Sequence, residues 1–212
     1  ILTRGGTILG TSRTPFKRLD IPEADGVDKV AAMKGTYREL GLDCLFMLGG
    51  NGSTKTANRL AQEGLNVIAL PKTIDNDTWG TDITFGFTSA VEIATKCIDD
   101  IHTTASSHGR VFVIEIMGHK VGWIPLYSAV AGGADVCLIP EIPYEMDNVI
   151  AAIDRRMQSG ARFTIIVVAE GAISREEAAL PKKEYKKLVA ARTSPSIAYD
   201  IAREIEARCG RE

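Results

Sequence analysis

The chain has 212 residues, of which 45% are hydrophobic and 25% are charged, and its formal net charge is −2 at pH 7. These values are ordinary for a globular protein and give no basic excess that would indicate nucleic acid or an anionic membrane as a partner. There is no run of about 18 apolar residues and no signal peptide, so we expect no transmembrane helix. The four cysteines form no C-x-x-C pair, which predicts reduced thiols in a cytoplasmic protein and no zinc site.

Short apolar runs alternate with helical patterns along the chain. Strands are predicted at 44–48, 66–70, 111–116, 136–139 and 163–169. Helices are predicted at roughly 27–40, 54–63, 88–107, 121–131, 147–159 and 196–208. Because the strand runs are continuously apolar, they favour a parallel sheet covered on both faces, within an α/β fold. The charged stretch 174–196 lacks a clear pattern and predicts a solvated loop or a short surface helix.

A glycine-rich stretch, LGGNGSTKTANRL at 48–60, follows the first predicted strand and opens the next helix. Gly49, Gly50 and Gly52 lack a Cβ, so a ligand can approach the backbone closely, and Ser53 is placed to cap the helix. The start of a helix attracts anions, which makes a phosphate site one interpretation. A tight turn without a ligand is the other. The spacing fits neither the Walker nor the dinucleotide glycine motif.

A second polar cluster, LPKTIDND at 70–77, follows the next predicted strand. Asp75 and Asp77 are two residues apart, so in an extended segment they point the same way. Two such carboxylates can divide labour, one accepting a proton and the other holding Mg²⁺ with phosphate oxygens. Thr73 can donate a hydrogen bond to a phosphoryl group, and Lys72 can neutralise phosphate charge. The alternative is that these residues only cap a turn.

Five motifs together resemble the phosphofructokinase family: GGNGS, PKTIDND, GTDITFGFTSA, SSHGRVFVIEIMGHKVGWIPLYSAVAGGAD and VVAEG. The likeness extends from residues 5–13 to 209–212. It implies a three-layer α/β/α fold with mainly parallel sheets in two Rossmann-like lobes. Residues 1–86 would be the end of the phosphoryl-donor (ATP) domain and 87–212 most of the fructose 6-phosphate domain. The chain starts without Met and lacks the family's G-G-x-x-P-G-x-N loop and C-terminal part, so we expect a fragment.

The resemblance also implies an activity, namely the Mg²⁺-assisted transfer of a phosphoryl group to the 1-hydroxyl of fructose 6-phosphate in glycolysis. Asp75 matches the base that receives the hydroxyl proton, and Thr73 matches a residue that binds the substrate and the transferring phosphate. Asp77 matches the acid that serves Mg²⁺. Arg13 matches an arginine that contacts the nucleotide phosphates.

Further matches concern the sugar phosphate. Glu170 matches a glutamate that binds the sugar, and Met117 and Gly118 match the backbone that lines the sugar pocket. Arg110 matches an arginine that reaches the sugar-phosphate site of a neighbouring subunit. The family therefore also suggests a homodimer or homotetramer with shared sugar sites.

Two positions depart from the family pattern. Asn51 replaces the acid of the usual G-G-D loop, so it keeps an acceptor oxygen but loses the charge, and Mg²⁺ would be held chiefly by Asp77. His119 replaces the arginine that usually follows M-G, with Lys120 beside it. An imidazole is not equivalent to a guanidinium, so these departures motivate a second hypothesis, a catalytically weak homologue that binds sugar phosphates. A lipid or nucleoside kinase is a third, motivated by the glycine loop alone.

The identity of the phosphoryl donor depends on two positions. The expected donor contacts are Arg13, Gly50, Asn51, Gly52, Ser53 and Lys72. Gly52 leaves room for the α-phosphate of ATP, where the family's pyrophosphate enzymes carry an acid. Lys72 is more usual in pyrophosphate enzymes. We expect ATP as the donor, because an acid in place of Gly52 would exclude ATP sterically and by charge, whereas the added cation of Lys72 is a weaker determinant. A pyrophosphate-dependent enzyme is the alternative.

Overall fold

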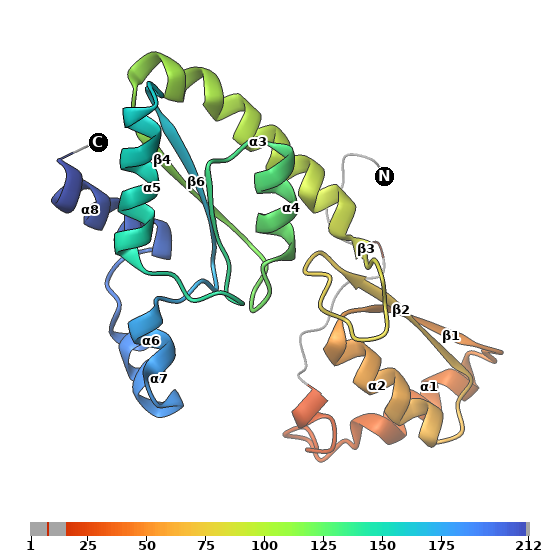
Figure 1. Cartoon of the computed structure of the whole chain (residues 1–212). Helices are drawn as coiled ribbons and strands as arrows, with labels where there is room; N and C mark the ends of the chain where they lie inside the picture. Colours follow the sequence, from red (N-terminus) through yellow and green to blue (C-terminus); the bar gives the residue numbers. More distant parts are fainter. Residues whose placement is uncertain (1–7, 9–15, 211–212) are drawn as a thin grey trace. The chain divides into compact units, whose positions relative to one another are not determined.

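The computed structural model describes residue 8 and residues 16–210. The chain divides into two compact units, Ile1–Lys72 and Thr73–Glu212, and the boundary falls within a strand. Helices alternate with parallel strands in both units, which confirms the predicted α/β class (Figure 1). Arg13 lies outside the described residues, so its proposed contact with the donor stays a prediction.

The first unit is built on a parallel strand pair. Its elements are η1 (Phe16–Arg18), α1 (Lys29–Glu39), β1 (Leu45–Gly49), α2 (Asn51–Gln62) and β2 (Val67–Thr73), which ends one residue past the boundary. The β1–β2 register pairs Leu45 with Val67 and Gly49 with Pro71, so both strands end at the same edge. In sheet order β3 (Phe85–Gly86) follows as β1-β2-β3.

Only one face of the first strand pair is covered within the part of the chain that the structure describes. Leu19, Val30 and Leu60 are buried against one face, where Leu60 comes from α2 and Val30 from α1. Phe46 and Leu48 point the other way and are each 58% exposed. Neighbouring strand residues alternate in direction, so within the described residues the helices cover one side of this strand pair and leave these two side chains on the other.

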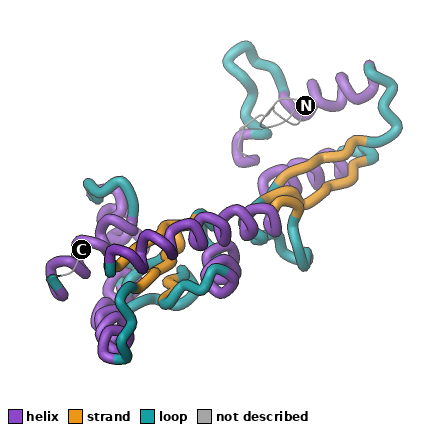
Figure 2. Tube along the Cα trace, turned by 90° about the horizontal axis from the view of Figure 1, so that it is seen from above, coloured by secondary structure: helices purple, strands orange, loops and turns teal. Residues whose placement is uncertain are grey.

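The second unit is a three-layer sandwich. After β3 its elements are α3 (Phe87–His108), β4 (Val111–Ile116), α4 (Trp123–Ala131), β5 (Val136–Leu138), α5 (Met146–Gln158), β6 (Thr164–Ala169), α6 (Arg175–Ala179), α7 (Lys182–Ala191) and α8 (Ile197–Cys209). The strand order is β4-β6-β5 and both pairings are parallel. Helices cover both faces of this sheet (Figure 1, Figure 2).

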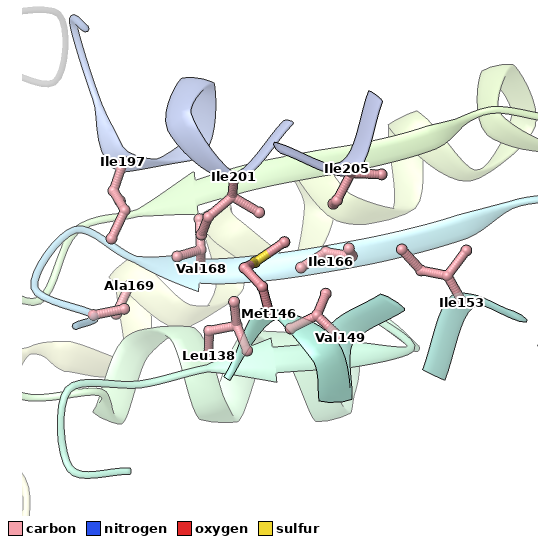
Figure 3. Close-up of a cluster of buried hydrophobic side chains, with 11 residues drawn as sticks. Leu138, Met146, Val149, Ile153, Ile166, Val168, Ala169, Ile197, Ile201 and Ile205 are labelled. Atoms are coloured by element: carbon pink, nitrogen blue, oxygen red, sulfur yellow. The ribbon is translucent and has the colours of Figure 1, made fainter. Parts of the chain in front are cut away.

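The central strand β6 holds the layers together, since all six of its residues are buried. Ile165 and Val167 pack toward the core formed with α3 and α4. Ile166 and Val168 point to the opposite face and pack against α5 and α8 (Figure 3). The prediction of a sheet covered on both faces is therefore confirmed for this unit. Burial of each such side chain stabilises the fold by about 1.5–3 kcal/mol.

The charged stretch 174–196 forms two short helices, α6 and α7. Ser174 begins α6 with a capping box, in which its hydroxyl accepts from the N–H of Glu177 and the Glu177 carboxylate accepts from the N–H of Ser174. The Glu177 carboxylate also pairs with Arg192 just after α7. Local capping and one ion pair therefore order a segment whose apolar pattern is weak.

Candidate active site

The glycine loop joins β1 to α2 in the first unit. Helix α2 begins at Asn51, and its N-cap is Gly50, which has no side chain to cap the first turn. The prediction that Ser53 is the N-cap is wrong, because Ser53 already lies inside the helix. Its side chain packs against Gly49, where an added Cβ would overlap the Ser53 Oγ and Cβ atoms. The uncapped first turn keeps the partial positive charge that attracts an anion.

The second polar cluster is a tight loop at the end of β2 in the second unit. The Thr73 hydroxyl lies 3.5 Å from the Asp75 Oδ2 atom and accepts from the Asp75 N–H at 3.3 Å. Asn76 adopts a left-handed conformation with φ of 54°. Its side chain bridges the loop, since Nδ2 donates to the Asp82 carbonyl and Oδ1 accepts from the Thr84 N–H. Asn tolerates this conformation better than most residues, which explains its use at the turn.

A third group of residues gathers where β4 and β6 end. The two strands are parallel neighbours with Ile116 paired to Ala169, so the residues just beyond them meet. The Glu170 carboxylate accepts from the Gly118 N–H at 3.1 Å and also from the His119 N–H. One carboxylate oxygen thus ties the end of β6 to the turn after β4, and Met117 in this turn is 62% exposed.

The turn after β4 is closely packed against its neighbours. His119 in this turn adopts a left-handed backbone conformation with φ of 53°. Two nearby glycines have no room for a side chain. A Cβ on Gly118 would overlap the Val121 carbonyl oxygen, and a Cβ on Gly171 would overlap the His119 carbonyl oxygen. On the other side, the Gly122 N–H donates to the Glu141 carboxylate at 2.8 Å. Glu141 and Gly171 were not among the predicted site residues, although both follow predicted strands.

Electrostatic interactions couple Asp75 to the residues that follow β4 and β6 in the second unit. Burial raises the pKa of the Asp75 carboxyl, and the negative charges of Asp77 and Glu170 raise it further. His119 and the Thr73 hydrogen bond oppose this shift. Four predicted residues therefore act on Asp75, which is half-buried. A carboxyl with a raised pKa among other carboxylates is a recognised sign of a catalytic site.

The remaining predicted residues are distributed elsewhere. Gly50, Asn51, Gly52, Ser53 and Lys72 belong to the first unit, at the ends of β1 and β2. Arg110 directly precedes β4, so it lies at the opposite end of that strand from Met117 and Gly118. Arg110 is exposed at that end of the strand, away from the turn that follows β4.

The oxygen donors at this site are of the kind that hold a divalent cation together with substrate phosphates. Among the described residues, no group of three or more His, Cys, Asp or Glu side chains could hold a metal by itself. Such cations are commonly bound by one or two carboxylates together with substrate phosphates, and Asp77 carries a carboxylate that could serve in this way. The negative charge that Asp77 and Glu170 impose on Asp75 is also of the kind that a cation would offset.

None of the helices in the described part of the chain combines the length and the apolar character needed to span a bilayer.

The fold and the site together define a class of protein. A glycine loop that opens a helix can bind phosphate, and ligands of open α/β sheets bind beyond the carboxyl ends of the strands, where each of the described polar loops lies. Comparison with known proteins narrows the class, since the phosphofructokinase family model matches residues 1–212. The chain belongs to the phosphofructokinase family, whose kinases generally need a divalent metal.

Individual relatives agree with this assignment. An ATP-dependent 6-phosphofructokinase of Spirochaeta thermophila is 56% identical over all of this chain and 59% of its own length. The phosphofructokinase structure from Saccharomyces cerevisiae matches 87% of this chain and 28% of its own, with 32% identity and a TM-score of 0.68. A pyrophosphate-dependent phosphofructokinase from Nitrosospira multiformis has a TM-score of 0.73 over 87% of this chain and 46% of its own, but at 21% identity it shows the fold alone. The chain spans about 59% of the length of its Spirochaeta relative.

Proposed function

We propose that the protein is an ATP-dependent 6-phosphofructokinase, which transfers a phosphoryl group from ATP to the 1-hydroxyl of fructose 6-phosphate. The observation that carries the proposal is the half-buried Asp75, set beside Thr73 and Asp77 and electrostatically coupled to His119 and Glu170. Membership of the phosphofructokinase family supplies the reaction. The product is fructose 1,6-bisphosphate, so the protein acts in glycolysis and in the cytoplasm.

Asp75 is the general base of the proposed reaction. It accepts the proton of the 1-hydroxyl while that oxygen attacks the terminal phosphorus of the donor, and ADP leaves. A raised pKa strengthens Asp75 as a base, and a positioned base contributes about 10²–10⁴ in rate. Thr73 binds the substrate and the transferring phosphoryl group. His119 takes the place of the arginine that spreads positive charge over that group.

The sugar phosphate is held by residues at the ends of β4 and β6. Glu170 binds the sugar through its Oε2 atom, since the Gly118 and His119 N–H groups of the turn both donate to Oε1. The backbone at Met117 and Gly118 lines the sugar pocket. Arg110, at the other end of β4, contacts the sugar phosphate of a neighbouring subunit in a homodimer or homotetramer. Its position away from the turn that follows β4 supports that division.

The donor phosphates are held by the first unit. The contacts are assigned to Arg13, Gly50, Asn51, Gly52, Ser53 and Lys72. Mg²⁺ is assigned to Asp77, with Asn51 as a neutral second ligand, and it supplies charge neutralisation on the phosphates when bound. In this assignment residues 1–86 belong to the donor domain and 87–212 to the fructose 6-phosphate domain.

ATP is favoured over pyrophosphate by the glycine loop. A Cβ added to Gly52 would have no heavy atom within 4 Å, so this face of the loop is open to a donor with further phosphates. The Spirochaeta relative is named as ATP-dependent. Lys72 is the observation that favours pyrophosphate.

The test is an assay of the complete gene product with fructose 6-phosphate and Mg²⁺, in which ATP and pyrophosphate are compared and the bisphosphate is followed. Turnover with ATP is expected. Turnover with pyrophosphate alone would show that Lys72 outweighs Gly52 as a guide to the donor.

A catalytically weak sugar-phosphate-binding homologue is the second candidate, and Asn51 and His119 are the residues that favour it. This candidate predicts binding of fructose 6-phosphate without turnover. The double variant Asn51→Asp with His119→Arg would then gain activity sharply, whereas in a competent kinase the same variant would change kcat little. A chain that ignores fructose 6-phosphate altogether would instead favour a lipid or nucleoside kinase.

A further inference from the structure

Thr84 is a buried polar residue eleven positions after Thr73, and it was not among the predicted site residues. It is 2% exposed, although its hydroxyl, N–H and carbonyl are all polar. Burying such groups is unfavourable unless each is hydrogen-bonded. Where the partners of Thr84 lie therefore shows what the residue does.

Two of its hydrogen bonds hold the loop that carries Asp75. The Thr84 hydroxyl donates to the Thr73 carbonyl oxygen at 2.7 Å. The Thr84 N–H donates to the Asn76 Oδ1 atom at 2.9 Å. These bonds clamp the residues on either side of Asp75, since Thr73 and Asn76 flank the segment Ile74–Asp75 that contains the proposed base.

The third hydrogen bond of Thr84 connects the loop to a rigid element. Its carbonyl oxygen accepts from the Phe87 N–H at 3.2 Å, at the first residue of α3. Phe87 is 4% exposed in the core shared by α3, α4 and β6. Between them Gly86 has φ of 106°, which favours glycine and lets the chain turn sharply from Thr84 into the helix. Thr84 thus joins the loop to the start of a 22-residue helix.

We propose that Thr84 is a positioning residue for the loop of residues 73–77. Its hydrogen bonds set the direction of the Asp75 carboxylate relative to the acceptor hydroxyl. This inference rests on the proposed kinase function and deepens it. Thr84 does not touch the substrate, so it acts through Thr73 and Asn76. Small displacements matter at such a position, because a shift of about 1 Å of a catalytic group can cost about 10² in rate.

A buried threonine can also serve packing alone, and the same unit offers that case for comparison. Thr164 is 0% exposed at the start of β6, and its hydroxyl has no hydrogen-bond partner among the described residues. Thr164 is therefore a matched control, since it shares the residue type and the burial of Thr84 but has no bond to the loop.

The experiment compares Thr84→Val, Thr84→Ser and Thr164→Val in the complete gene product. Val keeps the shape of Thr and removes the hydroxyl, whereas Ser keeps the hydroxyl. For Thr84→Val we expect kcat to fall about 10- to 100-fold, with the KM for fructose 6-phosphate and for ATP within about threefold of the parent. Thr84→Ser should restore kcat to within about threefold, and Thr164→Val should leave it unchanged.

Amide hydrogen exchange of residues 73–77 gives a second readout that does not need turnover. Exchange there should accelerate about tenfold or more in Thr84→Val and stay unchanged in Thr164→Val. A parent protein without kinase activity would contradict the proposed function, and the exchange would still decide whether Thr84 holds the loop. The positioning role of Thr84 is refuted if Thr84→Val keeps the kcat or the exchange protection of the parent. It is also refuted if Thr164→Val loses kcat to the same extent.

Discussion

Gly122 offers a sharp test of how tightly the turn after β4 is packed. In Gly122→Ala the backbone conformation, with φ of −97° and ψ of 19°, raises no left-handed strain. The added Cβ would lie 2.5 Å from the Ile139 Cβ atom, about 0.9 Å inside the 3.4 Å at which ordinary contact begins. It would also lie 2.8 Å from the Glu141 Oε2 atom. Either the start of α4 or the chain after β5 must therefore move by most of an ångström.

Two losses follow from that movement. Overpacking of this size lowers the free energy of unfolding by about 1–3 kcal/mol. The hydrogen bond from the Gly122 N–H to Glu141 is stretched, so His119 in the same turn shifts and kcat/KM for fructose 6-phosphate falls about 10- to 100-fold. The assay is steady-state kinetics of the complete gene product together with urea unfolding.

Gly35→Ala is the control for a glycine without close neighbours. Gly35 lies inside α1, and an added Cβ would have no heavy atom within 4 Å. This variant should gain about 0.5–1 kcal/mol of stability and keep its kinetics. If Gly122→Ala also keeps the stability and kcat/KM of the parent, the close packing of the turn against Ile139 and Glu141 is refuted.

Three further predictions concern titration and reactivity. Asp75→Asn should lower kcat by about 10²–10⁴ with little change in KM, as measured by steady-state kinetics, because it removes the base and keeps the shape. Wild-type kcat/KM should fall as the pH drops through the raised pKa of Asp75, because the base acts only when ionised; an acid limb at or below the ordinary aspartate value of about 3.9 would contradict this. Burial raises the pKa of the Cys137 thiol to about 11, so thiol labelling at pH 8 followed by mass spectrometry should modify the exposed Cys97 first and Cys137 last; equal rates would contradict the burial of Cys137.

Local patterns predicted most of the elements of the second unit. The run at 111–116 has the observed bounds of β4, and the helix predicted at 88–107 is α3 to within one residue at each end. These elements bury their apolar residues on the faces that the periodicity indicates. Asp75 could be selected from the sequence because strand ends in α/β sheets carry ligand-binding residues.

Other features had no local signal. The prediction of Ser53 as an N-cap used residue preference, but backbone geometry places the cap at Gly50, which contributes no side-chain oxygen. Strand β2 continues through Pro71, which resembles a turn residue, because its pairing with β1 extends to Gly49↔Pro71. The role of Thr84 depends on a contact with Thr73 across eleven residues, and such a contact leaves no periodic trace in either segment.

The strand order β4-β6-β5 has a consequence for how the second unit is made. The central strand, β6, is the last of the three in the chain. Its residue Thr164 pairs with Val111 of β4, about 50 residues earlier in the sequence. Among the described strands β4 and β5 pair only with β6, so until β6 leaves the ribosome their backbone edges on that side are unpaired. Synthesis therefore passes through a stage in which two apolar strands are open to wrong partners, and chaperones would act at that stage.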